Sequence, residues 1–223
     1  AATLTANAMA QNERASTQAL ERLSTGLRIN SSADDAAGMA MANTMTAQVK
    51  GLDMAVKNAN DAISMIQTAD GASIEIGDML QRMRELGVQA VNGTLTDADR
   101  TQLDLEYQQL ITEIGRVGDN TQWNGANLID DSAGASGTVT YQIGDTAQTM
   151  TVDFGDLSDD GDLGLTGDIT DMTNAAAAIL DVDVAIVALN TQRATYGAAI
   201  NRLEHTVDNL SNVSMNTQAA LSR

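Results

Sequence analysis

The clearest pattern in the chain is a repeat of apolar residues between positions 45 and 66. Their gaps alternate between four and three residues, an average of 3.5, the repeat at which helices wind around each other. The members of this seam are Met45, Val49, Leu52, Val56, Ala59, Ile63 and Ile66. A looser stripe continues to residue 90 and predicts one helix over 42–92. Several glycines weaken this helix, so we expect it to need partner helices along its length.

Two further stripes predict those partners. The first lies over 98–118, contains Leu103 and Leu110, and follows a helix-start signal at Thr96. Because the reversal at 92–94 is short, this helix should lie antiparallel to the first. The second partner lies over 177–212, and only Arg193 interrupts its stripe. Its seam residues include Ile186, Leu189, Ile200 and Leu203.

A shorter stripe near the start contains Leu20, Leu23 and Leu27 and ends near Gly26. Four helical segments with narrow apolar seams predict a bundle. The segment between the third and fourth helices differs, because 130–173 is rich in Asp, Gly, Ser and Thr. Within it, 139–143 and 150–154 alternate between apolar and polar residues, which predicts a β-hairpin with a four-residue loop at 144–147. We interpret 156–171 as a solvated acidic loop.

The predicted fold class is therefore mainly α, an elongated antiparallel helical bundle or coiled-coil rod with a small β-hairpin-containing middle region. Residues 1–130 would form the N-terminal part of the rod. Residues 131–173 would form the hairpin and acidic loop, and residues 174–223 the C-terminal helix of the same rod.

Composition favours helix-on-helix packing and excludes several kinds of reaction and partner. Aromatic residues make up 2% of the chain, and proline and cysteine are absent. Disulfides and thiolate chemistry are thereby excluded. The formal net charge of −18 makes nucleic acid and anionic membrane poor partners, because phosphates would be repelled. The sequence contains no unbroken run of 18 apolar residues, so we expect no transmembrane helix.

The sequence offers no constellation for catalysis, and we expect no enzyme activity, cofactor or metal. His205, the only histidine, stands beside a helix seam without a marked nucleophile, so we interpret it as a surface residue. Residues 159–162 (DDGD) resemble part of a calcium loop, but position 12 of an EF-hand would fall on Thr170 instead of Glu. An irregular Ca²⁺ site in this acidic region stays open beside a solubilising loop.

Several blocks in order resemble the bacterial flagellins. The N-terminal signature is matched by 21–31 (ERLSTGLRINS) and 34–38 (DDAAG), followed by 81–86 (QRMREL) and 90–94 (AVNGT). Residues 121–125 (TQWNG) fit as well, with Trp123 where the family usually has Phe. Residues 190–212 resemble the C-terminal flagellin helix. Flagellins usually have further terminal segments, which pair as coiled coils in the filament, so we expect this chain to stay monomeric.

The resemblance implies a function: a structural subunit that self-assembles into the bacterial flagellar filament for motility. It implies secretion to the cell surface and, as partners, other flagellin subunits, an export chaperone and the filament cap. It also implies that Arg82, Leu86 and Glu106 form a face that contacts neighbouring subunits and the vertebrate Toll-like receptor that senses flagellin. From the helical spacing we expect Leu86 to be exposed. The alternative function is a surface-displayed adhesin or polysaccharide binder on the same scaffold.

Overall fold

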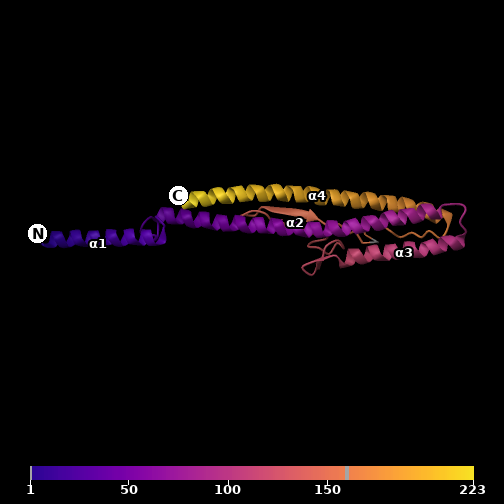
Figure 1. Ribbon diagram of the computed structural model, residues 1–223, viewed down its shortest axis with the longest axis horizontal. Coiled ribbons are helices and arrows are strands. Elements are labelled where there is room, and N and C mark those ends of the chain that lie inside the picture. Colours follow the sequence, from indigo (N-terminus) through magenta and orange to yellow (C-terminus); the bar gives the residue numbers. More distant parts are fainter. Residues whose placement is uncertain (1, 159–160) are drawn as a thin grey trace. The chain divides into compact units, whose positions relative to one another are not determined.

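The computed structural model describes residues 2–158 and 161–223. In chain order the described helices and strands are α1 (Ala2–Thr25), α2 (Ala36–Ala90), α3 (Asp97–Asn120), β1 (Gln122–Trp123), β2 (Ala126–Asn127), β3 (Thr138–Gln142), β4 (Thr149–Asp153) and α4 (Met172–Ser222) (Figure 1). The backbone forms two compact units, residues 52–212 and residues 1–51 with 213–223. The predicted fold class, long antiparallel helices with a small hairpin region, is confirmed.

In the larger unit, α2 lies between α3 and α4 (Figure 1). Ion pairs fix the antiparallel direction of α4. Arg84 of α2 bonds Asp183 at 2.7 Å, and Asp70, more than three turns earlier, bonds Arg193 at 2.8 Å. Arg193, the one interruption of the fourth apolar stripe, therefore faces a carboxylate on α2. The helix continues unbroken through Gly71, which confirms the single long helix.

α3 begins where the sequence predicted. The Thr96 side chain accepts from the Asp99 N–H at 3.3 Å, and the Asp99 carboxylate accepts from the Thr96 N–H at 3.0 Å. This reciprocal capping box satisfies two N–H groups that the first helical turn would leave unbonded. The Thr96 N–H bond, with help from the Thr96 hydroxyl, lowers the pKa of Asp99.

The core lies where the three helices meet. Small residues on α2 allow the backbones of the neighbouring helices to approach closely, since Ala59, Ala62 and Ala69 are fully buried. Ile76 and Leu80, also fully buried, fill the wider spaces. Among the seam residues named above, the buried ones are Val49, Leu52, Ala59, Ile66, Leu189 and Leu203. The half-buried ones are Met45, Val56, Ile63, Leu103, Leu110, Ile186 and Ile200.

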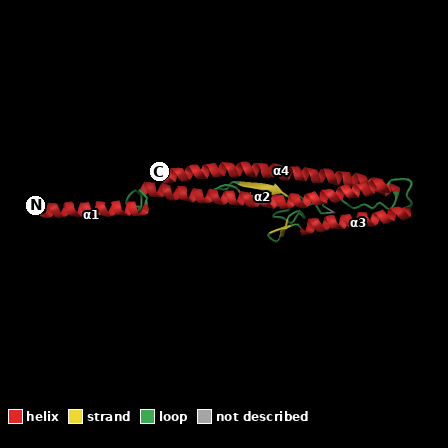
Figure 2. Cartoon of the chain, in the orientation of Figure 1, coloured by secondary structure: helices red, strands yellow, loops and turns green. Residues whose placement is uncertain are grey.

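The predicted hairpin is present as β3 and β4, with Tyr141 opposite Met150 and Val139 opposite Val152. The Ile143 N–H donates to the Gln148 carbonyl at 2.9 Å, which leaves 144–147 as the loop. The hairpin lies along α2 (Figure 2), where the Tyr141 hydroxyl contacts Met65 Sδ at 2.9 Å. A second, two-residue-strand hairpin, β1–β2, was not predicted. Its turn residues Asn124 and Gly125 have φ of 51° and 81°, the left-handed conformation that an Asn-Gly pair favours.

The interpretation of 156–171 as a solvated loop is wrong for its apolar residues. Leu157, Leu163, Leu165 and Ile169 are all buried in the core. The loop is held against α3, since Asp104 accepts from the Ile169 N–H at 3.0 Å. Asp156 accepts from the N–H and hydroxyl of Ser158, and Asp168 accepts from those of Thr170, so these carboxylates bond the loop itself while its leucines turn inward. The average composition of the loop is acidic and polar, so the sequence prediction missed the apolar residues that pack into the core.

The smaller unit contains α1. Leu20 and Leu23 are 64% and 82% exposed. The helix ends as predicted, with Gly26 at φ 71° and its N–H bonded to the Arg22 carbonyl at 2.9 Å. Beyond it, the Asp34 carboxylate accepts from the Asn30 and Ser31 N–H groups at 3.2 and 3.1 Å and closes the connection to α2.

Two glycines of α2 should respond in opposite ways to alanine. A Cβ at Gly71 would meet nothing within 4 Å, so Gly71→Ala should stabilise the fold by about 0.5–1 kcal/mol through helix propensity. A Cβ at Gly87 would lie 2.9 Å from Ile179 Cγ1 of α4, so Gly87→Ala should destabilise it. Thermal unfolding followed by circular dichroism measures both. Equal stabilisation by the two changes would show that α2 and α4 are not in close contact at Gly87.

Stability should depend on the ionisation of Asp168. Hydrogen bonds from the Thr170 hydroxyl, the Asn174 amide and the Thr170 N–H lower its pKa below the ordinary 3.8. Its carboxylate therefore stabilises the fold above pH 3.8, and this contribution is lost as the pH falls through the folded pKa. Asp168→Asn should lower the melting temperature at pH 7, and the gap to wild type should close below pH 3.8. A gap that persists at low pH would contradict the assignment.

Candidate interaction face

Two of the three residues proposed as a contact face meet on the surface of the larger unit. Arg82 projects from α2, and its Nε donates to Glu106 Oε1 of α3 at 2.8 Å. Arg82 also bonds Glu85, one turn further along α2, at 3.0 Å. The Arg82 and Glu106 side chains are 48% and 47% exposed. The antiparallel pairing of α2 and α3 thus produces a charged surface cluster, Arg82–Glu85–Glu106.

The electrostatics of this cluster are those of an exposed ion pair. The hydrogen bond that Arg82 donates to Glu106, followed by the one that it donates to Glu85, raises the pKa of Arg82, which stays cationic under all ordinary conditions. Because all three side chains face water, salt screens their attraction and the pair adds little to stability.

The prediction that Leu86 is exposed is wrong. Leu86 is fully buried and belongs to the same hydrophobic cluster as Leu80, Met83 and Ala90. The sequence argument assumed a single narrow seam on α2. In the structure α2 has a partner on each side, so its buried face is wider and includes positions beside the seam. Leu86 therefore packs in the core beneath the Arg82–Glu85–Glu106 cluster and is not part of the exposed surface.

A residue that the sequence analysis did not select anchors the turn beside this face. Arg100 is buried, with 4% exposure. Its guanidinium donates to the Ala90 and Asn92 carbonyls at 2.7 and 3.0 Å, and to Asp97 Oδ1 at 2.8 Å. It thereby satisfies carbonyl groups that the end of α2 would leave unbonded. The available signal was an arginine in the first turn of a helix that follows a tight reversal.

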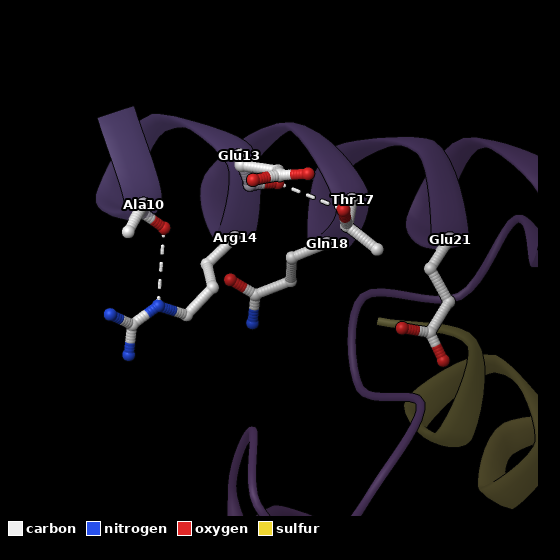
Figure 3. Close-up of a pocket in the computed structure, with 6 residues that line it drawn as sticks. All are labelled: Ala10, Glu13, Arg14, Thr17, Gln18 and Glu21. Carbon is white, nitrogen blue, oxygen red and sulfur yellow. Dashed lines mark hydrogen bonds between the residues drawn. The ribbon is translucent and has the colours of Figure 1, made fainter. Parts of the chain in front are cut away.

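No catalytic or metal-binding arrangement is found among the described residues. They contain no group of three or more His, Asp or Glu placed to hold a metal ion. His205 is exposed on α4. Asp159 and Asp160, on which the calcium-loop hypothesis rests, lie outside the described residues. A shallow hollow on α1 (Figure 3) is one helix face, where Arg14 and Thr17 bond the carbonyls of their own helix.

Comparison with known proteins decides the family. The family model of the bacterial flagellin N-terminal helical region matches residues 1–134. The family model of the bacterial flagellin C-terminal helical region matches residues 179–223. The chain belongs to the bacterial flagellin family. Flagellin from Halalkalibacterium halodurans is 47% identical over 209 residues, covering 92% of this chain and 76% of that protein. Flagellin from Bacillus subtilis is 40% identical over 256 residues, covering 100% and 84%.

Solved structures agree with this assignment. The crystal structure of Bacillus cereus flagellin matches with a TM-score of 0.61 and 36% identity, covering 74% of this chain and 94% of that one. A putative flagellar hook-associated protein from Vibrio parahaemolyticus reaches a TM-score of 0.70 at 14% identity, covering 86% and 99%, a likeness of fold alone. Flagellins are structural proteins, and family membership makes this chain a subunit that assembles with other flagellin subunits into an extracellular filament.

Stability measurements should separate Leu86 from the charged cluster above it. Leu86→Ala removes fully buried methyl groups and should cost about 2–5 kcal/mol. Arg82→Ala removes an exposed, solvent-screened ion pair and should leave the free energy of unfolding almost unchanged. Chemical denaturation of both variants measures the two free energies of unfolding. If Leu86→Ala unfolds at the wild-type denaturant concentration, the side chain faces water.

Proposed function

We propose that this chain is a secreted structural subunit of the bacterial flagellar filament and serves motility, with no catalytic role. The observation that supports this best is the match of both helical regions, 1–134 and 179–223, to the flagellin family. In the larger unit, α2, α3 and α4 bury a continuous apolar core that gives each subunit a stiff body. Function then consists of presenting complementary surfaces to neighbouring copies around a helical lattice. The export chaperone and the filament cap are further partners proposed from family membership.

The Arg82–Glu85–Glu106 cluster is proposed as the recognition surface of the subunit. It would contact neighbouring subunits in the filament and the flagellin-sensing Toll-like receptor when the subunit is free. Leu86 would act only by keeping α2 and α3 in register beneath the cluster. The charged groups can be desolvated by a partner that supplies opposite charge to each of them. No observation favours the alternative of an adhesin or polysaccharide binder.

The filament function is tested by deleting the gene and restoring it. Cells without the gene should lose both their filaments in electron micrographs and their motility in soft agar. The wild-type gene should restore both. Normal filaments and motility without the gene, in cells that have no second flagellin, would overturn the proposal.

The recognition surface is tested by a receptor-reporter dose response. Arg82→Ala with Glu106→Ala should weaken activation at least tenfold, about 1.4 kcal/mol. Arg116→Ala is the matched control, because Arg116 forms a similar exposed ion pair with Glu113 elsewhere on α3, at 2.5 Å. Circular dichroism should show unchanged helicity in all variants. Wild-type activation by the double variant would exclude this cluster as the recognition surface.

A further inference from the structure

The turn between α2 and α3 contains an asparagine followed by a glycine, Asn92-Gly93. Asparagine is a chemically labile residue, because its side-chain amide can be attacked by the next backbone nitrogen of the chain. Glycine as that next residue offers the least steric hindrance to the attack, since it has no Cβ. A second pair, Asn124-Gly125, forms the turn of the β1–β2 hairpin and gives the chain an internal comparison.

The Asn92 side-chain amide is held by two hydrogen-bond donors. Its Oδ1 accepts from the Thr94 N–H at 3.1 Å and from the Thr94 hydroxyl at 3.0 Å. When a nucleophile adds to Cγ of Asn92, negative charge develops on this same oxygen. Both donors then stabilise the tetrahedral intermediate, as the donors of an oxyanion hole do. Asn92 is exposed, so water reaches the amide.

The attacking nitrogen is activated from the other side by Arg100. The nitrogen of Gly93 belongs to the same peptide group as the Asn92 carbonyl. That carbonyl accepts from Arg100 Nη2 at 3.0 Å and from the Leu95 N–H at 3.2 Å. When the Gly93 N–H loses its proton, negative charge spreads onto the carbonyl oxygen, where the buried guanidinium stabilises it. The turn therefore favours deprotonation of this one peptide nitrogen.

We propose that Asn92 is a site of self-catalysed deamidation in the folded chain. The Gly93 N–H gives its proton to a solvent base, and the nitrogen forms a bond to Cγ of Asn92. The bond from Cγ to Nδ2 breaks, and ammonia leaves with a proton taken from water. The product is a succinimide ring between the two residues. Water then adds to one ring carbonyl and opens the ring, so the net reaction consumes water, releases ammonia and needs no oxidant or reductant.

Arg100 also favours one of the two ring-opening products. Attack of water at the former main-chain carbonyl of Asn92 gives isoaspartate, in which the chain continues through the side-chain carbons. This is the carbonyl that the Arg100 guanidinium polarises, and its oxygen becomes part of the new carboxylate. We therefore expect isoaspartate to be the major product. It lengthens the main chain within the turn and adds a negative charge.

Asn124-Gly125 lacks this arrangement. Both pairs are exposed, so access of water does not distinguish them. Among residues 2–158 and 161–223, none forms a hydrogen bond with the Asn124 side chain. The attack on Asn124 therefore has no donor to stabilise the intermediate.

The test follows both pairs in the full-length protein at physiological pH and temperature, by mass spectrometry of tryptic peptides. Cleavage after Arg84 and Arg100 releases residues 85–100, in which Asn92 is the one asparagine. Asn92 should convert at least tenfold faster than Asn124 in the folded chain. The two rates should converge in concentrated urea, where neither turn persists. Equal rates in the folded chain would overturn the inference, and so would a preference for Asn92 that persists in urea.

Variants of the turn test the individual contacts, with circular dichroism to confirm folding. Thr94→Ala removes the hydroxyl donor and should slow the conversion of Asn92 severalfold, whereas Thr94→Ser keeps the hydroxyl and should convert as wild type does. A Cβ at Gly93 would meet Met172 Cε at 3.7 Å, an ordinary contact, so Gly93→Ala should keep the fold and slow conversion at least tenfold. Wild-type conversion in Thr94→Ala would overturn the inference.

The products give an independent measurement. An isoaspartate-specific methyltransferase should label the converted wild-type protein, and the label should lie in the peptide 85–100. Aspartate as the major product at Asn92 would overturn the role assigned to Arg100 in opening the ring.

Discussion

The packing of α2 between two antiparallel helices is the constraint on which the other features depend. A helix from Ala36 to Ala90 that contains several glycines does not persist in water by propensity alone. In the larger unit it is held because α3 and α4 bury it from two sides. Buried alanines allow this close approach, and Gly87 marks the point where a side chain on α2 would collide with α4. A core rich in bulky aromatics would separate these backbones.

The few aromatic residues of the core lie where the helices meet the middle region. The rings of Phe154 and Tyr196 have centroids 5.9 Å apart, and the Tyr196 hydroxyl donates to the Phe154 carbonyl at 2.5 Å. This contact joins the end of β4 to α4. Burial raises the pKa of Tyr196 well above its ordinary value, so the hydroxyl stays a donor. The hairpin and the acidic loop thus cover the bundle by fixed contacts, with their leucines inside and their aspartates turned to their own backbone.

Sequence periodicity predicted the elements that repeat regularly along the chain. It missed the residues whose burial or bonding depends on a further segment packed against them. The helix over α2, the capped start of α3 and the β3–β4 hairpin follow from spacing, Thr96 and alternation. Leu86 was misplaced because one seam was assumed where two partners bury the helix. The buried leucines of 156–171 were missed because no period marks a loop that follows a groove. Arg100 shows the same limit, since its three partners meet only after the α2–α3 turn has formed.

Charge in this chain contributes little to the stability of the larger unit. The interhelical pairs Arg84–Asp183 and Arg193–Asp70 are half exposed and contribute modestly, so burial supplies most of the stability of the larger unit. The remaining acidic excess keeps free subunits apart. α4 departs from this arrangement, because its core face completes the fold while Leu180, Val184 and Val187 on its other side are apolar and exposed. The stability of the larger unit therefore comes from the core face of α4, and the exposed apolar side chains on its other side contribute nothing to it.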